Sequence, residues 1–299
     1  MYHLATIIPV IRRYRLPLSR DQLMLLMAAA NEILIGLDTY LAHSTSGTIV
    51  PNEWIPIIFG PIAGVLLLLA GLIALKNRPT ATIIANLTFL SSIVVGLLGA
   101  YFHLQRWILP AAPPGEQVSL ILLLWAPPIL APLTFSLVGV LGMSAVWIET
   151  PPDSGVLTLL GGYRLRLPYP KTQAYFYIVG MAALVTVISS VLDHARTGFI
   201  NPWLWLPTAA GVFGVAVAIT LGAIDKPTRA DLMTYLVTMV LFIIVGVIGF
   251  ILHINDDLIA ENTVVIERFI RGAPLLAPLL FANVGSLGVL VLLDPTESR

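Results

Sequence analysis

Residues 54–75 read WIPIIFGPIAGVLLLLAGLIAL, a run without a single charged side chain. Because a helix rises 1.5 Å per residue, a run of about 20 residues crosses a hydrocarbon core of about 30 Å. The whole chain has this character, since 58% of its 299 residues are hydrophobic and only 11% are charged, against about 25% charged residues in soluble domains. The composition therefore predicts an all-α integral membrane protein.

Seven further apolar runs predict seven further transmembrane helices. The eight predicted spans are 22–43, 54–75, 81–103, 118–147, 172–193, 203–224, 232–253 and 272–293. The fourth is long for one crossing. Its Pro127, Pro128 and Pro132 predict a kink, because proline removes helix hydrogen bonds.

Lys and Arg residues are unevenly divided between the two sides of these spans. Twelve lie in the segments on the side of both termini, and four lie on the opposite side: Arg106, Arg196, Arg268 and Arg271. Positive residues accumulate in cytoplasmic loops. The bias predicts a multi-pass protein of the cell (inner, cytoplasmic) membrane with both termini in the cytoplasm.

The segments outside the spans complete the predicted organisation. It comprises a cytoplasmic N-terminal interfacial segment (1–21), a first four-helix bundle (22–147), a cytoplasmic linker (148–171), a second four-helix bundle (172–293) and a cytoplasmic tail (294–299). Gly161-Gly162 in the linker is typical of a tight β-hairpin turn. The outer loop 254–271 alternates acidic and apolar residues in a way that suits a short surface helix.

The two predicted bundles share a repeated sequence. Residues that recur 151 positions later include Arg15-Leu16-Pro17 as Arg166-Leu167-Pro168, His43 as His194, Trp54 as Trp205 and Gly60 as Gly211. Gly96, Gly99 and His103 recur as Gly246, Gly249 and His253, and Pro128 and Pro132 recur as Pro274 and Pro278. A repeat of four helices keeps its orientation in the membrane, so the sequence predicts eight spans arranged as two tandem parallel repeats.

Four of the five His residues form two repeated pairs, His43 with His103 and His194 with His253. Each pair lies on the first and third helices of its unit, at the predicted outer ends, where the two imidazoles would face each other across the bundle. Such a pair suits ligation of haem b iron. Gly96 and Gly99, and likewise Gly246 and Gly249, share a helix face with His103 and His253 and would leave room for a macrocycle or a quinone ring. The alternative is that the His residues are ordinary interfacial side chains and that the Gly residues pack helices together.

The first span also carries two acids, Glu32 and Asp38, and an acid within the bilayer is a functional candidate by default. Glu32 and His43 share one helix face, about 16 Å apart. The second unit has Ala183 and Ser189 at the two acid positions, so the predicted intramembrane acids belong to the first half alone. This asymmetry suggests proton transfer through the first bundle, whereas the alternative is a polar contact between helices or with a partner subunit.

Two four-helix units with cytoplasmic termini, and His, Asn and acidic residues in the first span, resemble the quinol-interacting membrane subunits of polysulfide-reductase and nitrite-reductase type. The resemblance implies a quinone near the outer face and polar residues of the early helices around it. That family usually carries no haem, so the resemblance and the paired-His hypothesis exclude each other in part.

Three functional hypotheses remain open. The first is a membrane subunit of a respiratory or photosynthetic electron-transfer complex that contacts quinone or haem b, with other subunits and lipid as partners. The second is a small-solute or ion transporter, and the third is a scaffold subunit. The equal numbers of basic and acidic residues, 16 each, give no indication of nucleic-acid binding. The absence of Cys excludes thiolate metal sites, and no hydrolase motif occurs.

Overall fold

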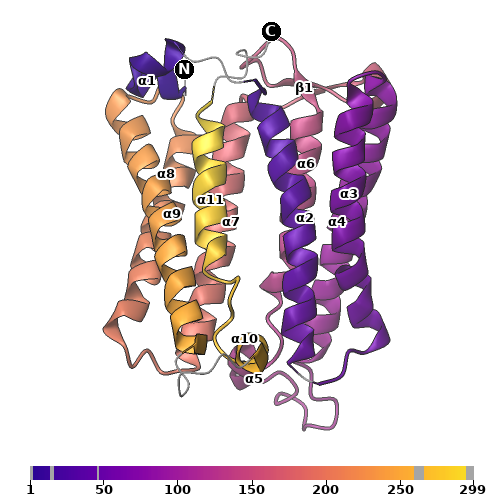
Figure 1. Ribbon diagram of the computed structural model, residues 1–299, viewed down its shortest axis with the longest axis vertical. Coiled ribbons are helices and arrows are strands. Elements are labelled where there is room, and N and C mark those ends of the chain that lie inside the picture. Colours follow the sequence, from indigo (N-terminus) through magenta and orange to yellow (C-terminus); the bar gives the residue numbers. More distant parts are fainter. Residues whose placement is uncertain (1–2, 14–16, 46, 259–265, 294–299) are drawn as a thin grey trace.

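In the computed structural model, two groups of long helices stand side by side (Figure 1). The structure describes residues 3–13, 17–45, 47–258 and 266–293. The elements in chain order are α1 (Leu4–Ile7), η1 (Pro9–Arg13), α2 (Arg20–Ser44), η2 (Pro51–Glu53), α3 (Trp54–Ala74), α4 (Arg78–Gln105), α5 (Leu120–Trp125), α6 (Leu130–Val146), β1 (Ile148–Glu149), β2 (Val156–Thr158), η3 (Leu160–Gly162), β3 (Arg164–Arg166), α7 (Lys171–Ala195), η4 (Pro202–Leu204), α8 (Trp205–Ala223), α9 (Arg229–Leu258), α10 (Ile266–Arg271) and α11 (Leu279–Val291).

Six of the described helices are long and apolar enough to cross a membrane: α2, α3, α4, α7, α8 and α9. Their ends agree with the predicted spans to within five residues, because local signals place them. Ser19 and Gln22, for example, form a reciprocal capping box at the start of α2. Asn77 caps α4, and Pro79 occupies its first turn, where a missing N–H costs nothing.

The fourth and eighth predicted spans differ from the prediction. Residues 118–147 form two helices, α5 and the 17-residue α6, because the chain turns extended at Ala126 before Pro127 and Pro128. The prolines thus break the helix completely instead of kinking it. In the eighth span only the 13-residue α11 is helical, and it begins directly after Pro278.

These six helices, together with the shorter α6 and α11, pack as two closed four-helix bundles. In the first bundle α2 contacts α3 and α6, and α4 contacts α3 and α6; in the second bundle α7 contacts α8 and α11, and α9 contacts α8 and α11. The bundles touch through α6 with α7 and α2 with α11. The fully buried rings of Phe176, Tyr235 and Phe242 belong to the core of the second bundle, whereas the core of the first contains Phe89 with Ala28, Ala29, Ala85, Leu67 and Val138.

The linker forms a three-stranded antiparallel sheet in the order β1-β2-β3. The β2–β3 hairpin turns where the Gly-Gly pair predicts it, with positive φ angles at Gly161 and Gly162. This sheet and α1 lie at one end of the molecule, which we call the linker end, whereas α5 and α10 lie at the opposite, far end (Figure 1).

The N-terminal segment packs on the second bundle. Ile7 is buried, the Leu4 N–H donates to the Leu292 carbonyl oxygen over 2.6 Å, and the Arg229 guanidinium donates to the Ile7 carbonyl oxygen. The predicted tail (294–299), part of the outer-loop helix (259–265) and the start of the repeat at Arg15-Leu16 lie outside the described residues.

Candidate functional site

Glu32 lies at the centre of the first bundle, in the middle of α2, and its side chain is fully buried. The backbones of α2 and α3 meet beside it, because Gly60 packs directly on the Glu32 carbonyl and on Gly36. A Cβ atom at Gly60 would collide with both. The glycines thus bring α3 close enough to seal Glu32 from the surroundings of the bundle.

Neither carboxyl oxygen of Glu32 makes a hydrogen bond of good geometry with any residue that the structure describes. The polar group that interacts with it is the hydroxyl of Ser92 on α4, which is also fully buried. Ser92 Oγ donates to the Thr88 carbonyl over 3.1 Å, so its lone pairs are left to accept. A charged carboxylate without a partner is costly in such a site, and a protonated carboxyl can donate to Ser92. Glu32 can therefore hold a proton beside Ser92, and it can release that proton when a positive charge compensates the carboxylate.

The matching place in the second bundle is apolar. Ala183 stands 151 residues after Glu32, and Phe242 stands 150 residues after Ser92, and both are fully buried. The Phe242 ring fills the space over Gly214 and contacts the Phe281 ring edge to face at 5.5 Å. The first bundle thus has an acid, Glu32, and a small hydroxyl residue, Ser92. The second bundle has a small residue, Ala183, and a large apolar one, Phe242.

Asp38 is not part of the Glu32 site. Six residues along α2 correspond to a rotation of about 240°, and Asp38 is exposed whereas Glu32 is buried. The charge that acts on Asp38 from the second bundle is that of Asp193 in α7. Asp193 lies 3.6 Å from Arg196. The sequence-based prediction assigned the intramembrane acids to the first half alone, and Asp193, near the end of α7, is an acid of the second half that interacts electrostatically with Asp38.

The structure brings His43 and His103 together at the far end of the first bundle. Their ring centroids lie 6.1 Å apart with an angle of 63° between the planes. Each Nδ1 lies 2.8 Å from a carbonyl oxygen, that of Thr39 for His43 and that of Pro128 for His103. His43 Nε2 lies 3.9 Å from the Glu53 carboxylate. The imidazoles are thus oriented by backbone groups, with a carboxylate beside them.

The second pair, His194 and His253, has different surroundings. His194 Nδ1 lies 3.4 Å from Ser190 Oγ, and its ring contacts Phe199 edge to face. His253 Nδ1 lies 2.9 Å from the Pro274 carbonyl oxygen. His103 and His253 therefore hold equivalent carbonyl groups, at the points where prolines interrupt the fourth and eighth segments.

The glycines beside these His residues pack against neighbouring helices, which favours the helix-packing interpretation over space for a flat ring. Pro132 and Ser136 of α6 cover Gly96 and Gly99, whereas Pro278 and Ala282 cover Gly246 and Gly249. A macrocycle would have to displace α6 or α11 from these contacts, so the surroundings of the paired His residues do not fit haem b. Among the described residues, no three His, Asp or Glu side chains are grouped to hold a metal ion.

A polar cluster at the linker end, which sequence reasoning missed, joins the bundles. Lys171 Nζ donates to Asp21 Oδ2 over 2.6 Å and to the Trp147 carbonyl over 2.7 Å, and Arg20 Nη1 donates to Thr172 Oγ1 over 2.8 Å. Both cations are almost fully buried, and Tyr175 OH donates to Asp21. The one signal available was that Arg20 and Lys171 are 151 residues apart. Lys171 binds Asp21, the residue next to Arg20, and Arg20 binds Thr172, the residue next to Lys171.

Comparisons of the chain with protein-family models, with curated proteins and with solved structures found no match.

Proposed function

We propose that the protein is an integral membrane subunit of a respiratory or photosynthetic electron-transfer complex. In this proposal it contacts quinone or quinol at the far end of the first bundle and passes protons through that bundle. The observation that carries the proposal is Glu32, a fully buried carboxyl without a hydrogen-bond partner among the described residues, where the second bundle has Ala183. The free-energy cost of burying an ionisable side chain within a membrane is tolerated where that side chain has a function.

The proposal includes eight spans, arranged as two parallel repeats. Equivalent contacts in the two bundles support this duplication. Gly139 packs on Phe89 and Ile93, and 146 residues later Gly285 packs on Met239 and Ile243. In this arrangement α6 and α11, with the broken segments before them, complete the fourth and eighth crossings.

The orientation is likewise proposed, with the linker end in the cytoplasm and the far end outside. The Lys and Arg bias supports it. Trp54, Trp203 and Trp205, which are exposed in or beside helices that begin at the far end, suit the outer interface.

In the proposed mechanism Glu32 is neutral at rest, with the Ser92 hydroxyl as the polar group nearest to hand for its proton. His43 and His103 exchange protons with a quinol at the far end, where the Glu53 carboxylate stabilises an imidazolium. Glu32 and His43 lie about 16 Å apart along α2, too far for direct transfer. Thr39, one turn below His43 on the same face, would be an intermediate group on this route.

The test is quinol-dependent electron transfer in membranes that contain equal amounts of assembled complex. Glu32→Gln keeps the shape of the side chain but cannot release a proton, so we expect assembly to persist and turnover to fall by at least tenfold. His194→Ala in the second bundle is the matched control and should change turnover less than twofold. An unchanged rate in Glu32→Gln would favour a scaffold subunit that positions its partners.

The interaction of Asp38 with Asp193 favours a second candidate, an ion transporter. The two acids come from the two predicted repeats, and transporters built from repeats bind their ions at the interface between them. Cation flux into vesicles that contain the protein alone, lost in both Asp38→Asn and Asp193→Asn, would replace the electron-transfer proposal.

A further inference from the structure

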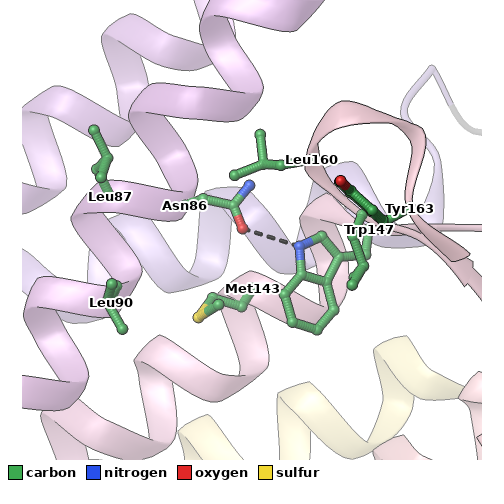
Figure 2. Close-up of a pocket in the computed structure, with 8 residues that line it drawn as sticks. Asn86, Leu87, Leu90, Met143, Trp147, Leu160 and Tyr163 are labelled. Atoms are coloured by element: carbon green, nitrogen blue, oxygen red, sulfur yellow. Dashed lines mark hydrogen bonds between the residues drawn. The ribbon is translucent and has the colours of Figure 1, made fainter. Parts of the chain in front are cut away.

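An apolar groove of about 330 Å³ opens on the side of the first bundle, at the linker end (Figure 2). Its walls come from α4, α6 and the β-hairpin of the linker, and the residues that line it are Asn86, Leu87, Leu90, Met143, Trp147, Leu159, Leu160 and Tyr163. Its volume is at the lower end of the range for small-molecule sites, about 300–1,000 Å³. None of these residues belongs to the Glu32 site or the paired His residues.

The polar groups in the groove are already paired with each other. The Trp147 indole N–H donates to Asn86 Oδ1 over 2.9 Å (Figure 2). Asn86 Nδ2 in turn donates to the Thr82 carbonyl over 2.8 Å. The remaining walls are aliphatic or aromatic, and Leu87 and Leu90 are more than half exposed. This lining suits a hydrocarbon chain and gives a polar ligand little to bind.

The depth of the groove matches the boundary of a membrane. Asn86 and Leu90 lie 8 and 12 residues after the start of α4 at Arg78, which is about 12 and 18 Å along the helix. Tyr163 and Leu160, at the other side of the groove, belong to the hairpin outside the helices. A hydrocarbon chain bound in this groove would therefore extend from the level of the hairpin toward the interior of the bilayer.

Four cations surround this end of the first bundle. Arg164 and Arg166 lie in β3 directly after Tyr163, and Lys76 and Arg78 lie at the start of α4; all four are exposed. None of the four makes an ion pair with a carboxylate in the part of the chain that the structure describes. Uncompensated basic residues at a membrane surface attract anionic headgroups, by about 1 kcal/mol each.

We propose that this groove is a binding site for an anionic phospholipid. One acyl chain occupies the groove between α4 and the hairpin, and the phosphate lies at Arg164 and Arg166. The site is separate from the far end, where quinol contact is proposed, so a failure of either proposal leaves the other standing.

Trp147 is a reporter inside the groove, because the other Trp residues (Trp54, Trp107, Trp125, Trp203 and Trp205) lie in or beside segments of the far end. The full chain is reconstituted in vesicles with a small fraction of brominated phosphatidylglycerol or of brominated phosphatidylcholine, and Trp fluorescence is measured. The Trp147 signal is the difference between the wild-type protein and Trp147→Phe. We expect the anionic lipid to quench this signal at least threefold more strongly, mole for mole, than the zwitterionic lipid.

Two variants test the two parts of the site. Arg164→Gln with Arg166→Gln should reduce the preference to less than 1.5-fold, whereas Lys226→Gln, at the equivalent turn of the second bundle, should leave it unchanged. Leu87→Phe should fill the groove and at least halve the quenching by both lipids, whereas Leu97→Phe, equally exposed on α4 outside the groove, should not. Soluble glycerol phosphate should not compete.

Equal quenching by the two lipids, or a preference that survives in the double Arg variant, would overturn the headgroup assignment. Quenching that Leu87→Phe leaves intact would overturn the groove as the place of the chain. Relief of quenching by glycerol phosphate would show a site for a free phosphate in place of a lipid site.

Discussion

The centres of the two bundles differ in polarity at a matched pair of buried positions. In the first bundle α2 carries Glu32 opposite Ser92, and in the second bundle α7 carries Ala183 opposite Phe242, although all four residues are fully buried. The long side chain comes from α2 in the first pair and from α9 in the second, and the short one from the opposite helix. The helices therefore pack in equivalent ways around a polar centre and an apolar one. The packing of the helices therefore does not require the Glu32 carboxyl.

Ala183→Glu should have the largest effect, because it places a carboxyl in the buried apolar cluster that contains the Phe242 ring. Overpacking costs about 1–3 kcal/mol and a buried polar group without a partner costs a similar amount, so we expect a loss of about 2–6 kcal/mol. The measurement is thermal unfolding of the purified protein. Adding Phe242→Ser should recover more than half of the loss. If the double variant is no more stable than Ala183→Glu, the two centres are not equivalent.

The contact between the bundles gives the next effect. Removal of one partner of a buried ion pair costs about 3–5 kcal/mol, and Lys171→Ala should lie near the lower limit, because Asp21 keeps some exposure to solvent. Asp21→Ala added to Lys171→Ala should cost less than Asp21→Ala alone, because the contact with Lys171 is already lost, although Arg20 and Tyr175 still lose Asp21 as a partner. Lys76→Ala, an exposed cation without an ion pair among the described residues, is the control and should change stability by less than about 0.5 kcal/mol.

Matched glycines of the two bundles should respond alike. Gly96→Ala and Gly246→Ala each place a methyl group against the backbone of a neighbouring helix, α6 or α11, and should each destabilise the protein by about 1–3 kcal/mol. Gly71→Ala meets open space in α3 and should be neutral or stabilising by up to about 1 kcal/mol. An unchanged stability of Gly96→Ala would instead indicate room for a ring beside His103.

Much of the fold follows from the sequence, because the length of an apolar run fixes a membrane helix almost by itself. The runs that became α3 and α9 needed no tertiary information. Residues 118–147 were harder, since the apolar character continues through Pro127 and Pro128 although the helix does not. The apolar composition of a segment indicates that it lies in an apolar environment, whereas its prolines determine where the helix hydrogen bonds stop.

The site was predictable where a residue is exceptional in its own helix. Glu32 is an acid in an apolar helix, so it could be singled out before its neighbours were known. The roles of Gly96 and Lys171 depend on which helix lies opposite. Gly96 suited a cofactor and a helix contact equally well until α6 was placed on it. Lys171 counted only toward the charge bias until Asp21 of the other bundle was found beside it.

The smallest effect concerns an acid of the linker. The His3 side chain, whose Nε2 lies 3.8 Å from Asp153 Oδ2, holds the pKa of Asp153 below its usual value. Folding thus favours the charged carboxylate. Its contribution to stability is complete above the unfolded pKa, about 3.9, and is lost as the pH falls through the lower pKa of the folded protein.

We therefore expect wild type to be slightly more stable than Asp153→Asn at pH 6 and the two to converge as the pH falls below about 3.9, because only the wild-type residue takes up a proton in that range. Asp153 is about one-third exposed, so the difference should be small, and thermal unfolding at closely spaced pH values is needed to resolve it. His3→Gln should show the same convergence, since it removes the other partner of the same contact. A constant difference between wild type and Asp153→Asn at every pH would mean that the N-terminal segment is held on the bundles by Ile7 and its backbone hydrogen bonds without a contribution from this charge.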